Sequence, residues 1–149
     1  MVDRMGWNKY FMDMAVLAAC RSTCIRRQVG AVLVKDNRVL CTGYNGAPAG
    51  APHCDEVGCI RAQLDVPSGE KHELCRGLHA EQNIIIQAAR FGVSIHGGTL
   101  YCTTYPCSIC AKMLVNSGVT QIFILHDYPD PTAREILSAG DLPIEKICT

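Results

Sequence analysis

Two short motifs constrain this chain most: His79-Ala80-Glu81 and Pro106-Cys107-Ser108-Ile109-Cys110. Both carry side chains that bind metals, and these can act together only if the fold brings the two segments to one place. A catalytic zinc site uses three protein ligands and leaves the fourth tetrahedral position to water. His79, Cys107 and Cys110 offer one nitrogen and two thiolates, so the two motifs together predict an open zinc site.

Both motifs also stand at the start of a predicted helix, over 80–90 and 107–117. The positive ends of the two helix dipoles therefore face the site and favour thiolate over thiol at the cysteines. Glu81 lies two residues from His79, close to the metal without needing to ligate it. We expect Glu81 to take a proton from the metal-activated water and then to deliver protons to the substrate and to its leaving group.

Each motif alone has an ordinary interpretation. The spacing of the two cysteines also occurs in redox-active thiol pairs, and a His-x-Glu at a helix start can be a cap or surface residues. Found together, with one predicted strand between their helices, they match the signature of zinc-dependent deaminases of nucleobases. The pair therefore favours a deaminase-type catalytic centre over either ordinary interpretation.

Apolar periodicity predicts one α/β domain over 1–149, which is a length that suits a single domain. A first helix is expected over 7–24, with its apolar face formed by Tyr10, Phe11, Met14, Leu17 and Ala18. Strands are predicted over 29–34, 38–44, 99–104, 119–125 and 142–147, and a last helix over 131–138. A hairpin followed by strand–helix–strand units implies a mixed five-stranded sheet with helices on both faces, in three α/β/α layers.

Composition excludes several classes. Lys plus Arg equals Asp plus Glu at 14 each, so no overall basic field favours nucleic acid. No apolar run is long enough to span a membrane and no targeting signal is visible, so a cytoplasmic location is expected. Ten cysteines in such a chain predict metal ligands and core residues rather than disulfides. Cys20, Cys41 and Cys102 are expected to be small buried hydrophobic residues.

Further stretches resemble the deoxycytidylate (dCMP) deaminase family, including its competence-associated bacterial branch. With the two motifs above they cover residues 21 to 110, and the most discriminating is Gly43-Tyr44-Asn45-Gly46. The other matching stretches are Arg21-Ser22-Thr23-Cys24, Val29-Gly30-Ala31-Val32, His53-Cys54, Cys75-Arg76 and His79-Ala80-Glu81-Gln82-Asn83.

The resemblance implies the cytidine-deaminase-like fold and hydrolysis of dCMP to dUMP and ammonia, which feeds thymidylate synthesis. It further implies that Asn45 hydrogen-bonds the sugar and that Tyr128 packs near the base or sugar, although a turn residue and an ordinary loop aromatic are the alternatives. Nucleotide contacts are expected in the glycine-rich segment 43–50. Family members are commonly hexamers that are activated by dCTP and inhibited by dTTP.

A long irregular insertion at about 46–77 needs something to order it. The family pattern makes Cys24, Cys54, Cys59 and Cys75 the expected ligands of a second, structural zinc, with His53 and His72 as competing ligands. Four thiolates would close such a site to water, and metal binding would supply folding free energy. The alternative is a set of reduced cysteines in a loop that is ordered by packing.

Other functions remain as alternatives. The chain could deaminate free cytidine or a tRNA adenosine, but the Gly-Tyr-Asn-Gly segment argues against the first and the balanced charge against the second. A catalytically idle zinc-binding module would have no use for Glu81. A DNA deaminase is disfavoured by the charge balance and by the lack of a run of exposed aromatic residues. The sequence leaves open whether dCMP alone, or also dCTP or deoxycytidine, is accepted.

Overall fold

The computed structural model describes residues 1–148 and contains a five-stranded sheet in the order β2-β1-β3-β4-β5. Strand β1 runs antiparallel to both β2 and β3, whereas β3, β4 and β5 are parallel. The mixed five-stranded sheet is thus confirmed. The strands are β1 (Gly30–Lys35), β2 (Arg38–Tyr44), β3 (Thr99–Thr104), β4 (Gln121–His126) and β5 (Ile144–Lys146).

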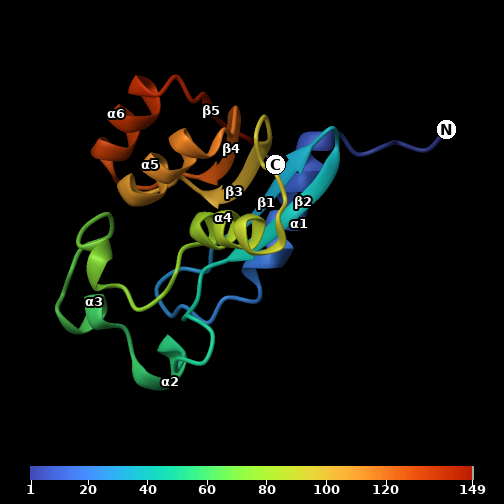
Figure 1. Ribbon diagram of the computed structural model, residues 1–149. Helices are drawn as coiled ribbons and strands as arrows, with labels where there is room; N and C mark the ends of the chain where they lie inside the picture. The colour runs from blue at the N-terminus through green and yellow to red at the C-terminus, as the bar shows by residue number, and fades with distance from the viewer. Residues whose placement is uncertain (149) are drawn as a thin grey trace.

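Helices cover both faces of this sheet, which confirms the three layers (Figure 1). Helix α1 packs on one face, and α4, α5 and α6 lie on the other. In residues 1–148 no helix has the length and apolar character needed to traverse a lipid bilayer. The helical segments are α1 (Trp7–Ala19), α2 (Cys54–Val57), α3 (Ile60–Gln63), the 3₁₀ turn η1 (His72–Leu74), α4 (Ala80–Phe91), α5 (Ser108–Ser117) and α6 (Pro131–Ala139).

Alternation along the strands divides the core in two, because successive side chains point to opposite faces. In β1, Ala31 and Leu33 join the cluster under α4, α5 and α6, whereas Val32 and Val34 join the cluster under α1. Strand β3 follows the same rule, since Leu100 and Cys102 face one side and Tyr101 faces the other. Every strand of the sheet centre is therefore buried on both faces, as the apolar runs predict.

The first helix differs from its prediction in length and orientation. It ends at Ala19 instead of about Cys24, because the buried Ser22 accepts a hydrogen bond from Cys24 N and forms a turn there. The buried residues are Phe11, Met12, Ala15 and Ala19, whereas Tyr10 and Leu17 of the predicted face are exposed. Cys20 is also exposed, so its expected burial is wrong, whereas Cys41 and Cys102 are buried.

A close contact between α1 and the start of β1 explains why small residues lie on the buried side of this helix. A Cβ at Gly30 would collide with backbone atoms of Ala15 and Ala19, so α1 lies directly against the start of β1. This close approach selects the Ala15–Ala19 side of the helix for the interface and turns the bulkier Leu17 outward, where it is 71% exposed. Helix register here depends on backbone distance rather than on side-chain hydrophobicity.

Several chain ends meet at one edge of the sheet. The carboxyl ends of the parallel strands β3 and β4 share that edge, and the antiparallel pairing brings the start of β1 and the end of β2 to it. The insertion between β2 and α4 leaves the same edge, and its short helices α2 and α3 lie away from the strands, below α4 in Figure 1. Open α/β sheets bind ligands at such carboxyl edges.

Candidate metal centre and active site

The start of α4 is fixed by a local cap and by the neighbouring strand. His79 occupies the N-cap position, and its backbone N–H donates to the Gln82 side chain at 2.7 Å. The Asn83 side chain donates to Tyr44 O at 2.7 Å and ties the helix to the end of β2. Gly43 lets the two elements touch, because a Cβ there would lie 2.5 Å from Ala80 O. His79 and Glu81 are thereby held in place.

The second motif is held by a residue far along the chain. Cys107 is the N-cap of α5, and the next backbone N–H, that of Ser108, donates to Asp130 Oδ2 at 2.8 Å. The other carboxylate oxygen of Asp130 accepts from Ala133 N at 3.1 Å and caps α6. Asp130 is buried, so a single carboxylate joins the N-termini of two helices.

The two motifs converge on one point. His79 Nδ1 lies 3.3 Å from Cys107 Sγ and 3.3 Å from Cys110 Sγ. Ligand atoms of a tetrahedral zinc site with ordinary bond lengths lie ~3.5 Å apart. A Glu81 oxygen lies within 4.8 Å of the ligand atoms of His79 and Cys110. These residues fit a zinc ion with Glu81 beside it.

Electrostatics at the centre favour a divalent cation. The hydrogen bond from Cys110 and that with His79 lower the pKa of Cys107 to about 4 against the opposing effect of burial. Burial alone would lower the pKa of His79, but its hydrogen bonds with Cys107 and Cys75 raise that pKa to about 10. Burial raises the pKa of the Glu81 carboxyl, which suits a group that must accept and release a proton.

A pocket of about 140 Å³ opens onto this centre and is lined by His79, Glu81 and Cys107 together with parts of the insertion. Asn45 lines it as well, with its side chain already engaged. Its Oδ1 accepts from Val29 N at 2.8 Å and its Nδ2 donates to Arg27 O at 2.8 Å. The amide thus fixes the chain entering β1 and keeps one N–H and one lone pair for another partner.

Tyr128 lines the opposite side of the pocket, after the end of β4. Its hydroxyl accepts from Gly69 N at 2.9 Å and so joins this loop to the insertion. The ring lies 4.8 Å from the Arg27 guanidinium and 5.8 Å from the His72 ring centre. Tyr128 is therefore a wall residue whose hydroxyl still has its own hydrogen to donate.

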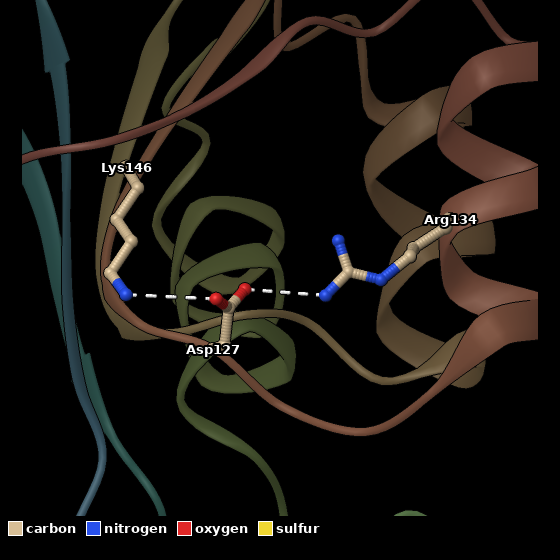
Figure 2. Close-up of polar contacts among 3 residues, drawn as sticks. All are labelled: Asp127, Arg134 and Lys146. Atoms are coloured by element: carbon tan, nitrogen blue, oxygen red, sulfur yellow. Dashed lines mark hydrogen bonds and ion pairs between the residues drawn. The ribbon is translucent and has the colours of Figure 1, made fainter.

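An ion-pair network anchors the loop that carries Tyr128. Asp127 accepts from Arg134 at 3.2 Å and lies 3.6 Å from Lys146 Nζ, so it connects α6 with β5 (Figure 2). The Arg134 guanidinium also stacks 4.3 Å above the Tyr105 ring. The three charged side chains are more than half exposed, whereas the Tyr105 ring is buried, so these surface ion pairs add little stability.

The four cysteines expected at a second zinc lie around the same pocket. Cys24, Cys54, Cys59 and Cys75 all line it as free thiols. Burial and the nearby Cys24, Cys75 and Cys59 thiols raise the pKa of Cys54. Within residues 1–148, however, the groups whose ligand atoms all lie within 4.8 Å of one another belong to the His79 centre.

The two competing histidines have other neighbours in the structure. His53 pairs its Nδ1 with the Thr23 hydroxyl at 2.9 Å. His72 lies at the first metal centre, where one of its ring nitrogens is within 4.8 Å of the ligand atoms of His79 and Cys107. Both of its ring nitrogens are shielded from solvent and have no hydrogen-bond partner among the described residues. The structure thus associates His72 with the catalytic centre rather than with the four cysteines.

Sequence reasoning missed two other features of the site. Asp130 gave a weak signal, as an acidic residue just before Pro131 at a helix start. The arginines of the pocket (Arg26, Arg27, Arg61 and Arg76) gave none, because a balanced total charge conceals a local concentration.

We expect Asp130→Ala to lower the free energy of unfolding by about 2–3 kcal/mol, because two backbone N–H groups lose a buried, charged acceptor. Urea unfolding measures this loss, and zinc affinity should fall as the start of α5 loosens. Asp127→Ala is the matched control, since it removes a neighbouring but exposed carboxylate. Equal losses of stability for the two variants would contradict the role assigned to Asp130.

Comparison with known proteins agrees with this geometry. The ComE operon protein 2 of Bacillus subtilis is 37% identical over 147 residues, which cover 98% of this chain and 74% of that protein. The deoxycytidylate deaminase of Schizosaccharomyces pombe is 44% identical over 139 residues, which cover 92% of this chain but only 43% of the yeast protein.

Among solved structures, the dCMP deaminase of cyanophage S-TIM5 in complex with dCMP and dUMP matches with a TM-score of 0.78 and 29% identity. The match covers 97% of this chain and all of the phage chain. Residues 5–126 match the family model of the cytidine and deoxycytidylate deaminase zinc-binding region, which includes both motifs of the metal centre. The chain therefore belongs to the cytidine and deoxycytidylate deaminase family.

Proposed function

We propose that this protein hydrolyses dCMP to dUMP and ammonia. The observation that carries the proposal is the convergence of His79, Cys107 and Cys110 beside the buried Glu81, at the bottom of a pocket. Support for dCMP as the substrate comes from the phage structure that binds dCMP and dUMP and from the yeast relative. The product dUMP would supply thymidylate synthesis.

In this mechanism the residues of the chain have separate tasks. When bound by His79, Cys107 and Cys110, zinc would supply the Lewis acidity that lowers the pKa of a water molecule, so that this water can lose a proton and act as a nucleophile. Glu81 accepts the proton of that water and passes a proton to N3 of the cytosine, which makes C4 electrophilic. After water has added at C4, Glu81 carries a proton to the amino group, and ammonia leaves. Glu81 is buried against the Cys110 thiol, so bulk water does not compete for its proton.

Asn45 and Tyr128 face the remaining space of the pocket, and we assign them to the deoxynucleoside. The free N–H or lone pair of Asn45 would hydrogen-bond the sugar. The ring of Tyr128 would pack beside the base or sugar and could donate its hydroxyl hydrogen. Both residues also have structural bonds, so substituting either one is expected to affect stability as well as substrate binding.

We further propose a second, structural zinc bound by Cys24, Cys54, Cys59 and Cys75. The mutual effect of these thiols on the pKa of Cys54 supports it, as does the lack of disulfides in the described residues. Thiolate ligands need a reducing compartment, which agrees with a cytoplasmic location. A hexameric assembly that responds to dCTP and dTTP completes the proposal, on the resemblance to the family alone.

The test is deamination of dCMP, dCTP, deoxycytidine and CMP by zinc-loaded protein, followed as absorbance loss, with zinc counted in the same sample. We expect rapid loss with dCMP and two zinc ions per chain. If none of the four compounds reacts although zinc is bound, the proposed reaction is wrong. Such a result would favour a non-catalytic zinc-binding protein or a deaminase of another base.

A further inference from the structure

The pocket gathers four arginine side chains that form no ion pair within residues 1–148. Arg26, Arg27, Arg61 and Arg76 line it together with the catalytic Glu81. The ion pairs found in residues 1–148 involve none of these four arginines. Since the chain as a whole is electrically balanced, this local excess of cations calls for an anionic ligand.

Arg61 is the most informative of the four because it is buried, with only 7% of its surface exposed. Its one hydrogen bond, from Nη2 to Pro67 O, is long at 3.5 Å, and its Nε has neither solvent nor a partner among the described residues. A buried guanidinium normally has a carboxylate or phosphate to accept its forked donors. Arg61 therefore has unused donors on a side chain that lines the pocket.

Arg61 lines the same pocket as the metal centre and lies close to it. Burial lowers the pKa of His72 most, and the hydrogen bond with His79 lowers the pKa of Cys75 most. The positive charge of Arg61 is close enough to lower both pKa values further. Arg26 is bonded to Val66 O at 3.0 Å and Arg27 lies over the Tyr128 ring. Arg61 is thus the buried arginine of this group, and its Nε lacks both solvent and a partner among the described residues, whereas Arg27 and Arg76 are exposed to solvent.

The glycine-rich segment 43–50, where the sequence predicts nucleotide contacts, is a weaker candidate for binding phosphate than the arginines. The backbone N–H of Asn45 donates to Val29 O at 3.1 Å, and that of Gly46 donates to Leu78 O at 3.0 Å. The N–H of Ala51, just beyond the segment, donates to Pro48 O. The amides of Asn45 and Gly46 are thus committed to carbonyls outside the segment, at 29 and 78, which makes the arginines the better anion ligands.

We propose that Arg61 of α3 binds the 5′-phosphate of the nucleotide and makes this site selective for a nucleoside monophosphate over the nucleoside. The inference rests on the proposed function and adds a residue of the insertion as the determinant of specificity. The dianionic phosphate would satisfy the Arg61 donors, while Arg27 and Arg76 at the exposed rim would add attraction.

The experiment measures binding in the Glu81→Gln background, where turnover does not interfere. Calorimetry gives Kd for dCMP, for deoxycytidine and for inorganic phosphate, with and without Arg61→Gln. We expect Arg61→Gln to raise Kd for dCMP roughly 10- to 100-fold and to abolish competition by phosphate, but to change Kd for deoxycytidine less than about 3-fold. Arg90→Gln, on the exposed side of α4, is the matched control and should change none of these values.

Arg61→Lys keeps the positive charge but loses the planar, bidentate donor geometry of the guanidinium. It should recover part of the affinity for dCMP, and this recovery would distinguish a phosphate contact from a defect in folding. An equal loss of affinity for dCMP and deoxycytidine would overturn the proposal, as would an unchanged Kd for dCMP. A loss of bound zinc would overturn it too, since Arg61 would then be a countercharge for the cysteine group. If the active enzyme fails on dCMP, the proposed function falls, whereas phosphate binding still tests Arg61 separately.

Discussion

Replacing Glu81 with Gln should abolish dCMP deamination, with a fall in kcat of at least about 1000-fold, while the zinc expected at His79, Cys107 and Cys110 stays bound. Gln has nearly the same shape but cannot accept a proton, and Glu81 is assigned every proton transfer of the reaction. Single general acid–base groups contribute ~10²–10⁴-fold, and here one carboxyl serves the attacking water, the ring nitrogen and the leaving group. The measurement is kcat for dCMP together with zinc content on the same preparation.

The burial of Glu81 makes this test informative. It is 4% exposed and burial raises its pKa, so no solvent path replaces the missing proton carrier. Glu135→Gln on the exposed face of α6 is a matched control that should retain full activity. Substantial turnover by the Glu81 variant with a full zinc content would remove Glu81 from the mechanism.

The catalytic centre could be predicted from the sequence because its information is local. His79 and Cys107 each begin a helix, and both helix starts are visible in the periodicity of the chain. Once two helix N-termini are fixed on adjacent parts of a sheet, the ligand types dictate the metal chemistry. The central strands β1 and β3 could also be predicted, since strands that are buried on both faces leave continuous apolar runs.

The remaining features depend on contacts between distant residues, which periodicity does not reveal. The face of α1 is chosen by its close approach to Gly30, not by its most hydrophobic residues. The insertion is placed by long-range bonds such as that from Gly69 N to the Tyr128 hydroxyl. His72 was therefore considered as an alternative ligand of the cysteine group, and the structure has it beside His79.

Asn45 combines a local motif, which the sequence shows, with long-range contacts, which it does not show. Its motif drew attention to the residue, and the structure places it in the pocket. Both ends of its amide nevertheless bond the backbone at 27 and 29, which the motif alone did not suggest. A residue that lines a site can thus shape the backbone around the site as well as contact a ligand.

Replacing Cys54 with Ser should remove one zinc ion per chain and unfold the insertion at 46–77, while the zinc bound by His79, Cys107 and Cys110 remains. Cys54 is a buried residue of the group, and burial and the neighbouring thiols raise the pKa of its thiol in the metal-free chain. Zinc offsets the cost of ionising these neighbouring thiols, because it binds them as thiolates. Structural zinc sites supply roughly 10 kcal/mol of folding free energy. The other anchors of the segment include the hydrogen bonds from Arg26 to Val66 O and from Gly69 N to the Tyr128 hydroxyl, whereas η1 contains no buried residue.

Zinc stoichiometry and limited proteolysis measure the Cys54 result. Cleavage should appear within 46–77 in Cys54→Ser and be absent from Cys20→Ser, which changes an exposed cysteine outside the group. Because the insertion carries Arg61 and His72 into the pocket, kcat/KM for dCMP should fall even though the catalytic zinc is kept. If Cys54→Ser keeps two zinc ions and an intact insertion, packing alone orders this segment and the second metal is not bound by these cysteines.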